Sequence, residues 1–426
     1  MVAPNGLAHV IEDLLGDDLP VAVEAYDGTR MGRPDADATL VVRSPAALQR
    51  LLTAPGELGF ARAYVEGHLD VEGDIFAALA LRDHLPEVRL SRRQWAHVLR
   101  LATAAGGLRA LRPLPPPQEE ARLRGRRHSR ARDAAAVAHH YDVSNQFYRL
   151  VLGPSLTYSC AVWRDPSVSL EDAQAAKHEL VCRKLGLEPG MRLLDVGCGW
   201  GGMVLHAAEH HGVRAVGITV SARQADLAGK RVAEAGLADR VEIRLQDYRD
   251  VDDGPYDAIS SIGMFEHVGL ASLRLYFERL HRILRPQGRL LNHAIARPPG
   301  DRPRFARGGF IDRYVFPDGE LHEVGEVVSA MQRESFEVRH VESLREHYAL
   351  TLRRWVANLE AGWDEAVAEA GVARARIWRL YMAASALNFE AARTQIHQVL
   401  AVRADGGRSE MPLRPSFDRE QRPGAG

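Results

Sequence analysis

The stretch Leu193-Leu194-Asp195-Val196-Gly197-Cys198-Gly199-Trp200-Gly201-Gly202 indicates the fold class of this chain. An apolar run leads into Asp195, and a helical pattern, Met203 to His210, follows the last glycine at once. Because glycine has no Cβ, a turn of this kind lets a ligand approach bare backbone. The N-terminus of the following helix adds N–H donors and a positive dipole end. The stretch therefore predicts a site for a small nucleotide-like molecule.

Two classes of nucleotide cofactor fit this glycine pattern. Gly197, Gly199 and Gly202 satisfy the dinucleotide fingerprint, but an NAD enzyme needs an acid about twenty residues further on. That place holds Gly217-Ile218-Thr219-Val220-Ser221. Asp195, two residues before the first glycine, is placed as in S-adenosylmethionine (SAM) methyltransferases. We therefore favour SAM over a nicotinamide cofactor and over a purely structural turn.

The composition limits the classes of protein to which this chain can belong. The 426 residues are 46% hydrophobic with a net charge of −1, which predicts an ordinary globular protein of two domains. The three cysteines form no Cys-x-x-Cys pair and the first residues show no signal-peptide pattern, so we expect a reducing cytoplasm. No apolar run approaches the ~18–20 residues that span a bilayer, so any membrane contact is expected from the surface.

Residues 1–105 are expected to form a small α+β domain. Strands are predicted at 21–26 and 39–43, and helices at 45–52, from Asp74 and from Ser91. This stretch contains no catalytic constellation, so it is a docking module or scaffold. Residues 106–135 follow as a linker, stiffened by Leu114-Pro115-Pro116-Pro117.

Six arginines lie close together at the end of this linker, at positions 122, 124, 126, 127, 130 and 132. They form either a solvated charged segment or a surface that is attracted to anionic lipid, at about 1 kcal/mol per basic residue. Nucleic acid ranks last, because we find no aromatic-interleaved platform or recognised nucleic-acid motif.

Residues 136–405 alternate helix and strand. Strands are predicted at 192–196, 214–218, 241–245, 257–262 and 288–294, with helices near 203–211, 221–236 and 271–284. This pattern predicts an α/β, doubly wound parallel sheet with its ligand at the carboxyl ends of the strands. Two later strands, near 335–341 and 396–403, are expected to form an edge hairpin. Residues 406–426 are expected to be a disordered tail.

Polar residues near the expected ligand edge are the candidates for chemistry. Asp247 and Tyr248 follow the third strand and would lie beside an adenine, and Gln224 would reach the ribose hydroxyls. Cys160, Glu266, His293, Ile295 and Tyr348 stand in apolar surroundings. Each alone has a structural explanation: a core thiol, a carboxylate at a helix start or a satisfied buried histidine. Together, however, 160, 266 and 293 fall where this fold places its pocket. No metal site is predicted.

The chain resembles the cyclopropane-fatty-acyl-phospholipid synthases, SAM enzymes that alkylate double bonds in membrane lipid acyl chains. The resemblance extends through the catalytic domain into the N-terminal module. Its motifs are His140-Tyr141-Asp142-Val143-Ser144-Asn145, Tyr158-Ser159-Cys160-Ala161, the 193–202 loop, Gly217-Ile218-Thr219, Gln246-Asp247-Tyr248, Phe265-Glu266-His267-Val268-Gly269, His293-x-Ile295, Tyr348-x-x-Thr351-Leu352-x-x-Trp355, and residues 55–60 and 69–74.

The resemblance implies two groups of site residues. SAM would be held by Tyr158, Ser159, Gly197, Gly199, Thr219 and Gln224, with Asp247 at its adenine end and Asp195 and Tyr248 beside them. A bicarbonate ion would be held by Cys160, Glu266, His293, Ile295 and Tyr348. Attack by an alkene on the sulfonium methyl leaves a carbocation, and bicarbonate would remove its proton as a general base. Aromatic faces such as Phe147, Tyr148, Trp163 or Phe265 would stabilise the cation.

Three departures from the family pattern bear on the product. Ser144 replaces a usual Gly, Val162 stands where an aromatic is common, and Ala294 where Thr is common. Loss of a proton from the transferred methyl closes a cyclopropane, whereas loss from a neighbouring chain carbon gives a methylene branch. The pattern is similar to the actinobacterial branch that makes 10-methylene precursors of 10-methyl (tuberculostearic-type) chains. We hypothesise that Val162 and Ala294 reshape the acyl channel around the base.

Two other functions stay open at this point: SAM-dependent N- or O-methylation of a small soluble metabolite, and non-catalytic lipid binding. The expected partners are unsaturated phospholipid acyl chains and an anionic membrane surface, with no nucleic acid. A separate reductase and a homodimer or higher homo-oligomer are compatible with the sequence. The expected location is cytoplasmic and peripheral, on the inner face of the membrane.

Overall fold

The computed structural model describes residues 20–84, 111–121, 143–300 and 308–417, together with residues 6–8, 11, 107, 123, 125–127, 129, 130, 132, 133 and 136. The chain divides into two compact units. The first comprises Met1–Arg122, Gly308–Val315 and Leu359–Leu387, and the second comprises Leu123–Arg307, Phe316–Asn358 and Asn388–Gly426. The domain ranges expected from the sequence are continuous, whereas both units are assembled from separate segments.

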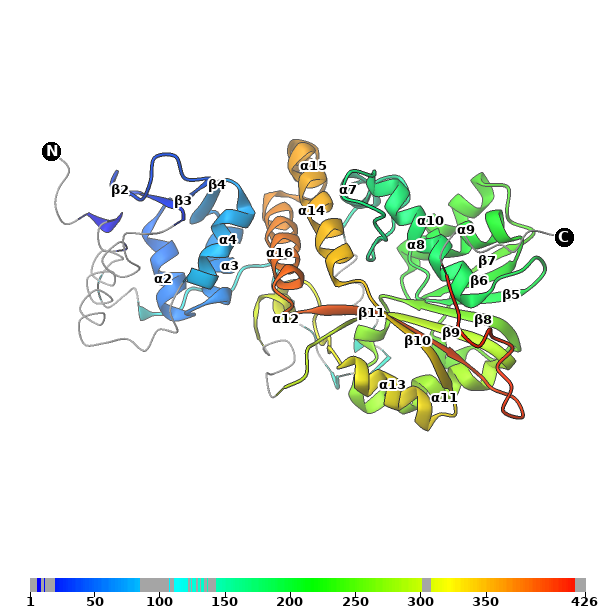
Figure 1. Cartoon of the computed structure of the whole chain (residues 1–426). Coiled ribbons are helices and arrows are strands. Elements are labelled where there is room, and N and C mark those ends of the chain that lie inside the picture. The colour runs from blue at the N-terminus through cyan, green and yellow to red at the C-terminus, as the bar shows by residue number, and fades with distance from the viewer. Residues whose placement is uncertain are drawn as a thin grey trace. The chain divides into compact units, whose positions relative to one another are not determined.

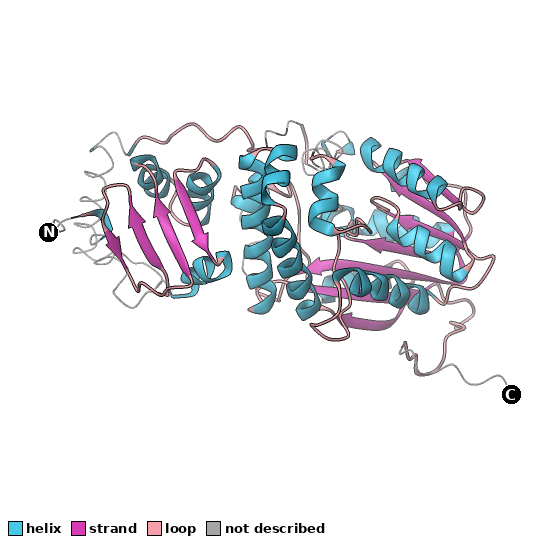
Figure 2. Ribbon diagram, turned by 90° about the horizontal axis from the view of Figure 1, so that it is seen from above, coloured by secondary structure: helices cyan, strands magenta, loops and turns pink. Residues whose placement is uncertain are grey.

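The first unit is built on a sheet whose described strands are β1 (Ala22–Ala25), β2 (Arg30–Met31), β3 (Ala38–Val42) and β4 (Leu69–Gly73). Their order is β2-β1-β3-β4, with β1 and β3 parallel (Figure 2). The expected strands at 21–26 and 39–43 are confirmed, but β2 and β4 were not foreseen. β4 contains Asp70, Glu72 and Gly73, residue types that are depleted in strands, so its composition does not indicate a strand.

Helices complete this unit. They are α2 (Pro45–Thr53), α3 (Glu57–Val65), α4 (Ile75–His84), α12 (Phe310–Tyr314), α15 (Trp363–Ala370) and most of α16 (Val372–Glu390). Helix α2 begins as the sequence predicts, with Ser44 in extended N-cap geometry and Pro45 in the first turn. The helix expected from Ser91 lies outside the described residues.

Residues from the expected linker are held within the first unit by buried ion pairs. Glu120, which is 5% exposed, accepts hydrogen bonds from Arg62 at 2.6 Å, Arg313 at 2.9 Å and the Tyr314 hydroxyl at 3.0 Å. Arg50 donates to the carbonyl oxygens of residues 114 and 115 at 3.0 and 2.6 Å. The described segment 111–121 is therefore anchored to this unit at residues 114, 115 and 120.

The second unit contains a sheet of seven described strands in the order β10-β11-β9-β8-β5-β6-β7. The strands are β5 (Arg192–Val196), β6 (Arg214–Thr219), β7 (Val241–Leu245), β8 (Tyr256–Ile262), β9 (Leu284–Ala296), β10 (Glu337–Ser343) and β11 (Gln395–Val402). Strands β5–β9 pair in parallel, which confirms the α/β prediction, and β10 and β11 add an antiparallel edge.

Helices cover both faces of this sheet (Figure 1). α8 (Leu170–Leu185), α9 (Gly202–His211) and α10 (Ala222–Glu234) lie on one face, and α11 (Leu273–Ile283) and α13 (Val324–Arg333) on the other. Leu193 belongs to the apolar cluster with α8 and α9, whereas the next residue, Leu194, belongs to the cluster with α11 and α13. Adjacent strand residues point to opposite faces, so each buried leucine contributes roughly 1.5–3 kcal/mol to a different layer.

Further elements include α7 (Asn145–Leu152), α14 (Arg345–Ala361) and the single-turn 3₁₀ helices η2 (Tyr248–Asp250), η3 (Phe265–His267) and η4 (Leu270–Ser272). Ser144 has a clear structural role, because its side chain accepts the Phe147 N–H at 3.0 Å and caps α7. His140, Tyr141 and Asp142 lie outside the described residues. In the described part of the chain, no helix combines the length and the apolar character needed to span a bilayer.

Candidate functional site

The glycine loop connects β5 to α9 at the carboxyl edge of the sheet. Gly197 has φ +81°, and a Cβ added there would come within 2.9 Å of the Met264 side chain. Both steric crowding and backbone conformation therefore favour glycine at this position. The N–H groups of Gly197 and Cys198 donate to the Ile218 carbonyl at 3.0 and 2.9 Å, which holds the loop against the end of β6.

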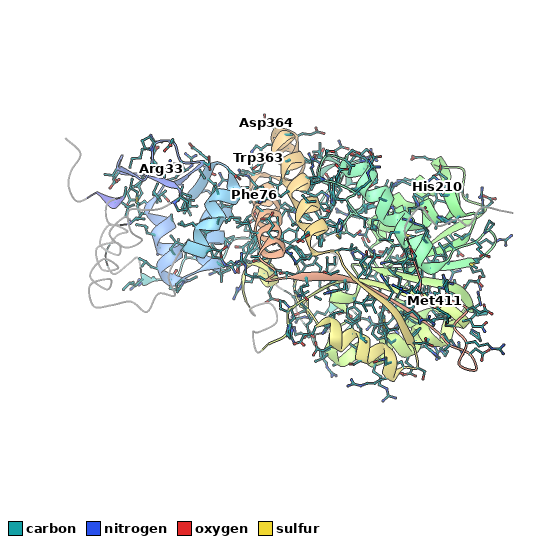
Figure 3. The ribbon with its side chains drawn as sticks, in the orientation of Figure 1. Arg33, Phe76, His210, Trp363, Asp364 and Met411 are labelled. Atoms are coloured by element: carbon teal, nitrogen blue, oxygen red, sulfur yellow. The ribbon has the colours of Figure 1, made fainter. Side chains whose placement is uncertain are left out.

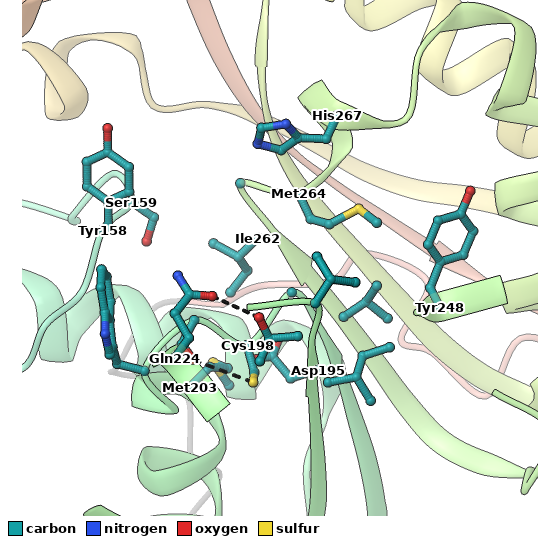
Figure 4. A pocket seen from close by; sticks show the side chains of 18 of the residues that line it. Tyr158, Ser159, Asp195, Cys198, Met203, Gln224, Tyr248, Ile262, Met264 and His267 are labelled. Atoms are coloured by element: carbon teal, nitrogen blue, oxygen red, sulfur yellow. Dashed lines mark hydrogen bonds between the residues drawn. The ribbon is translucent and has the colours of Figure 1, made fainter. Parts of the chain in front are cut away.

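A cavity opens beside this loop, and Figure 4 shows side chains from several elements around it. Its empty volume is about 1210 Å³, open solvent at the mouth included. All nine residues expected at a SAM site line it: Tyr158, Ser159, Asp195, Gly197, Gly199, Thr219, Gln224, Asp247 and Tyr248. The lining also contains Lys177, His178, Met264 and His267, which the sequence did not single out as cofactor-binding residues.

Asp195 is buried beneath the cavity at 2% exposure. Burial raises the pKa of its carboxyl to about 6, against the lowering effects of the Ser260 hydrogen bond and the Lys177 charge. Ser260 Oγ donates to Asp195 Oδ1 at 2.6 Å. Burial likewise lowers the pKa of Lys177 to about 8, with Asp195 opposing that shift. Lys177 was not predicted from the sequence, because a lysine in a helical pattern is usually exposed to solvent.

Thr219 and Gln224 form the next part of the lining. Thr219 Oγ1 donates to Gln224 Oε1 at 2.8 Å, and Ser221 caps α10 by accepting the Gln224 N–H at 3.4 Å. Figure 4 draws hydrogen bonds as dashed lines and includes Gln224 among the side chains around the cavity. The amide oxygen of Gln224 is occupied by Thr219, so its NH2 group is the end that suits a ligand hydroxyl.

Asp247 has a structural partner that the sequence did not predict. Its Oδ1 accepts from the backbone N and Nε of Arg249 at 2.9 and 2.8 Å, and its Oδ2 accepts from Nη2 at 2.6 Å. Arg249 also pairs with Asp133 at 3.2 Å. The carboxylate of Asp247 is therefore held rigidly at the cavity wall. Its contact with an adenine amine stays a prediction.

A second group of polar residues lies at the end of β9 and in η3. The backbone N–H of Ile295 donates to Glu266 Oε1 at 2.7 Å. Glu266 Oε2 is buried and has no hydrogen-bond partner among the described residues. Burial raises the pKa of Glu266 to about 7, and the Ile295 N–H opposes the shift. One carboxyl oxygen is therefore fixed while the other is available to a ligand.

His293 is the second member with an unsatisfied buried atom. The side chain is 1% exposed, and its Nδ1 lies 2.9 Å from Gln398 Nε2. Its Nε2 is buried and finds no hydrogen-bond partner within the described chain. Burial, together with the nearby charges of Lys177 and Lys184, holds the pKa of His293 well below its usual value. The ring is therefore neutral at physiological pH.

Cys160 and Tyr348 are linked to this group by hydrogen bonds that involve the backbone of Leu344. Cys160 Sγ donates to the Leu344 carbonyl at 3.7 Å, and the Tyr348 N–H donates to the same carbonyl at 3.1 Å. The Leu344 N–H donates to Ile396 on β11, which lies opposite Ile295 in the sheet register. Burial raises the pKa of the Cys160 thiol far above its usual value, so it remains protonated.

The structure therefore divides the predicted residues into two groups. The nine residues expected to hold SAM line one cavity, and none of Cys160, Glu266, His293, Ile295 and Tyr348 is in its lining. Three rings connect the groups: Tyr158 stacks on Trp355 with ring centroids 5.3 Å apart, and Trp355 meets Tyr348 edge-on at 6.0 Å. These contacts place an aromatic surface between the cavity and the second group.

The aromatic residues expected to face a cation have other contacts. Phe265 packs against Tyr276 and Phe277 in the core, and Trp163 Nε1 donates to Thr351 Oγ1 at 3.0 Å. Phe147 and Tyr148 are fully buried. Their role at a cation stays a prediction, whereas Trp355 was noted only as part of a family motif.

The described members of the arginine cluster mostly have intramolecular partners. Arg127 Nε donates to Asp318 at 2.6 Å, and Arg132 pairs with the same carboxylate. Arg130 makes two bonds of 2.9 Å to Asp250. These ion pairs give the cluster a structural role in the second unit. Attraction of the cluster to an anionic surface stays a prediction, and Arg122 and Arg124 lie outside the described residues.

One cluster outside the cavity has residue types that bind metals. Ligand atoms of Cys182, His206 and His211 lie within 4.8 Å of one another. Glu179 Oε2 lies within 3.4 Å of His206 Nε2 and 3.0 Å of His211 Nε2, and the ring of His210, labelled in Figure 3, lies 4.5 Å from that of His206. Hydrogen bonds to Glu179 orient His206 and His211 within this cluster.

Known proteins are similar to this chain in sequence and in fold. Residues 128–399 match the family model described as mycolic acid cyclopropane synthetase. The chain is 49% identical over 408 residues to a protein of Mycobacterium tuberculosis named probable fatty acid methyltransferase, covering 93% of this chain and 94% of that protein. It is 33% identical over 366 residues to the cyclopropane-fatty-acyl-phospholipid synthase of Escherichia coli, covering 86% and 88%. A crystal structure of a mycolic acid cyclopropane synthase complexed with SAH and CTAB aligns with a TM-score of 0.60 at 36% identity, over 63% of this chain and 98% of that one.

Proposed function

The chain belongs to the mycolic acid cyclopropane synthetase family of SAM-dependent methyltransferases, and from that premise we propose that it alkylates the double bond of an unsaturated phospholipid acyl chain. The observation that supports this reaction best is the pair of unsatisfied buried atoms, Glu266 Oε2 and His293 Nε2. Unpaired buried polar groups are costly, and a bound ion is one way to satisfy them. Methylation of a nitrogen or oxygen nucleophile gives no reason for such a pair, whereas deprotonation of a hydrocarbon needs a held base.

The residues of this second group fit bicarbonate. Glu266 supplies an acceptor for a hydroxyl hydrogen, neutral His293 supplies a donor for an anionic oxygen, and the Cys160 thiol stays uncharged. When bound there, bicarbonate would supply a general base for the proton that an alkylated double bond must lose. Tyr348 would complete the site, since it connects to it through Leu344 and the β9–β11 edge, and Ile295 would contribute by holding Glu266 in place.

The chain's own residues supply the remaining requirements. The glycine loop, Thr219 and Gln224 hold SAM at the carboxyl edge of the sheet. The faces of Tyr158, Trp355 and Tyr348 stabilise positive charge that develops on the acyl chain, because aromatic faces attract cations. Burial of Cys160, His293 and Trp355 excludes water that would otherwise capture that charge.

The product that we propose is a 10-methylene chain, the precursor of a 10-methyl chain. It is supported by the higher identity to the relative named fatty acid methyltransferase, 49%, than to the cyclopropane synthase, 33%. Val162 and Ala294 would shape the acyl channel, and Ala294 is buried on β9 opposite His397. A separate reductase would be required for the methyl product. Because the substrate is a membrane lipid, the protein would act peripherally from the cytoplasmic face.

The test uses SAM labelled in its methyl group and vesicles of oleoyl phospholipid. After saponification, the label is expected in the fatty acid fraction, and vesicles of the saturated stearoyl lipid are expected to take up none. Label in the head group, or in the fatty acid fraction with both lipids, would refute alkylation of the double bond.

A further inference from the structure

Three buried polar side chains form a line behind His293. Lys184 on α8 is 0% exposed and donates from Nζ to Gln398 Oε1 at 2.7 Å. Gln398 on β11 is also 0% exposed, and its Nε2 lies 2.9 Å from His293 Nδ1 on β9. The three residues come from distant parts of the chain, and β9 and β11 bring His293 and Gln398 directly opposite each other.

Lys184 determines which way the Gln398 amide faces. A lysine ammonium has donors and no acceptor, so only the amide oxygen can satisfy it. Lys184 also pairs with Glu342, and its Nζ lies 5.8 Å from the Phe417 ring centroid, so the buried ammonium has a carboxylate and an aromatic face to compensate its charge. The amide NH2 of Gln398 is therefore turned toward His293.

That orientation selects one tautomer of His293. An amide NH2 can only donate, so His293 Nδ1 must accept and carries no hydrogen. A neutral imidazole then bears its proton on Nε2. Because the two nitrogens lie on different edges of the ring, the Nε2–H faces away from Gln398, and Nε2 has no hydrogen-bond partner in the described chain.

We propose that Gln398, oriented by Lys184, is a positioning residue that fixes His293 as the Nε2–H tautomer and so presents a hydrogen-bond donor to an anion. The identity of that anion as bicarbonate rests on the proposed function, whereas the tautomer assignment does not. With the opposite tautomer, a bare Nε2 lone pair would face an anionic oxygen and repel it. The Lys184–Gln398 pair therefore gives the histidine an N–H donor for an anionic ligand without charging the ring.

The direct test is the tautomer of His293 in the free protein. We would record long-range ¹H–¹⁵N spectra of histidine-labelled protein without SAM or lipid, and assign His293 by the signal that disappears in His293→Gln. The wild type is expected to show the Nε2–H pattern. In Gln398→Glu, the introduced carboxylate accepts from Nδ1 and the pattern is expected to shift to Nδ1–H or to the doubly protonated ring. Gln398→Met, which has similar length and no amide, is a second variant expected to lose the preference.

The second readout is the response to bicarbonate in CO2-depleted buffer. Gln398→Glu is expected to raise the bicarbonate concentration for half-maximal activity by about tenfold or more, with the SAM KM within about twofold of wild type. Gln395→Glu on the same strand is the matched control and should match wild type in both readouts. Melting temperatures verify that each variant is folded.

The outcomes separate the two proposals. An Nδ1–H signal for His293 in the wild type, or an unchanged tautomer in both Gln398 variants, overturns the positioning role. An Nε2–H signal in a wild type whose activity ignores bicarbonate supports the tautomer assignment and overturns the proposed ion. A tenfold bicarbonate effect that Gln395→Glu shares would overturn the specific role of Gln398.

Discussion

The backbone N–H of Ile295 holds one oxygen of Glu266 at 2.7 Å and leaves the other oxygen buried without a described partner. This bond joins η3 to the end of β9 and orients the carboxyl. A carboxyl held in this way is positioned before any ligand arrives, which reduces the reorganisation that binding and catalysis would otherwise need.

Glu266→Gln is expected to reduce kcat by about 10²-fold or more, because an amide cannot reproduce both acceptors of the carboxylate. Cys160→Ser is expected to lose activity as well, since it changes the buried thiol beside Leu344. SAM affinity, measured by calorimetry, should change little in both. Glu278→Gln, on the exposed side of α11, is the matched control. Unaltered turnover in both site variants would remove the case for the bicarbonate site.

The pH profile of kcat/KM should reflect the raised pKa of Glu266. Burial raises this pKa to about 7, so the carboxyl is protonated below that pH and ionised above it. Since the ionised form is the one that accepts a hydroxyl hydrogen, kcat/KM is expected to rise with pH through about 7 and then level off. Rates would be measured from mildly acidic to mildly basic pH at constant bicarbonate concentration. Activity that is flat across this range would contradict the role of the ionised carboxyl.

Gln224→Leu should weaken SAM binding and leave the rate of the chemical step nearly unchanged. The substitution removes the amide that bonds Thr219 and the NH2 group that suits a ribose hydroxyl. We expect the SAM Kd to rise by about tenfold, the equivalent of about 1.4 kcal/mol, and kcat at saturating SAM to stay within a few fold. Gln332→Leu on the exposed side of α13 controls for the loss of a surface amide. A lower kcat with unchanged SAM affinity would contradict the assignment of Gln224 to the cofactor site.

The arginine cluster allows its structural and membrane roles to be separated. Arg132→Ala removes a partner of Asp318 and is expected to cost roughly 1–3 kcal/mol of unfolding free energy. The pKa of Asp318 is held below its usual value by hydrogen bonds from Arg132 and Arg127, against burial. This contribution is therefore present above the carboxyl's unfolded pKa and is lost as the pH falls through its folded pKa.

Arg126→Ala addresses the membrane role, because Arg126 is exposed. We expect it to leave the melting temperature unchanged and to weaken cosedimentation with anionic vesicles by a few fold, in agreement with about 1 kcal/mol per basic residue. Equal vesicle binding by Arg126→Ala and wild type would leave only the structural role for the described part of the cluster.

Local sequence signals predicted the parts of the fold that depend on neighbouring residues. The glycine loop and the parallel strands β5–β9 follow from local patterns, and seven of the nine cavity residues lie at or shortly after strand ends that share one edge of a sheet. Tyr158 and Ser159 were indicated only by the resemblance to the family. β2 was not predicted, because a strand of only two residues leaves no alternating pattern in the sequence. The antiparallel placement of β11 between β9 and β10 depends on long-range pairing, and only a hairpin was expected there.

The missed site features all depend on contacts between distant residues. Gln398 lies 105 positions from His293 and 214 from Lys184, so no periodicity or motif could connect them. The pairing of Arg132 with Asp318 spans 186 residues, which explains why the cluster looked like a free charged surface in the sequence. Lys177 was hidden for another reason, because a lysine in a helix is usually solvated.

The most direct measurement of the central claim is product analysis after incubation with SAM and oleoyl phospholipid vesicles. Mass spectrometry is expected to show an acyl chain heavier by one CH2 unit, and ozonolysis is expected to cleave it at the branch carbon to a ketone, as a methylene group requires. A heavier chain that resists ozonolysis would be a cyclopropane and would contradict the proposed product. An acyl chain of unchanged mass, in a protein that still consumes SAM, would contradict alkylation of the double bond altogether.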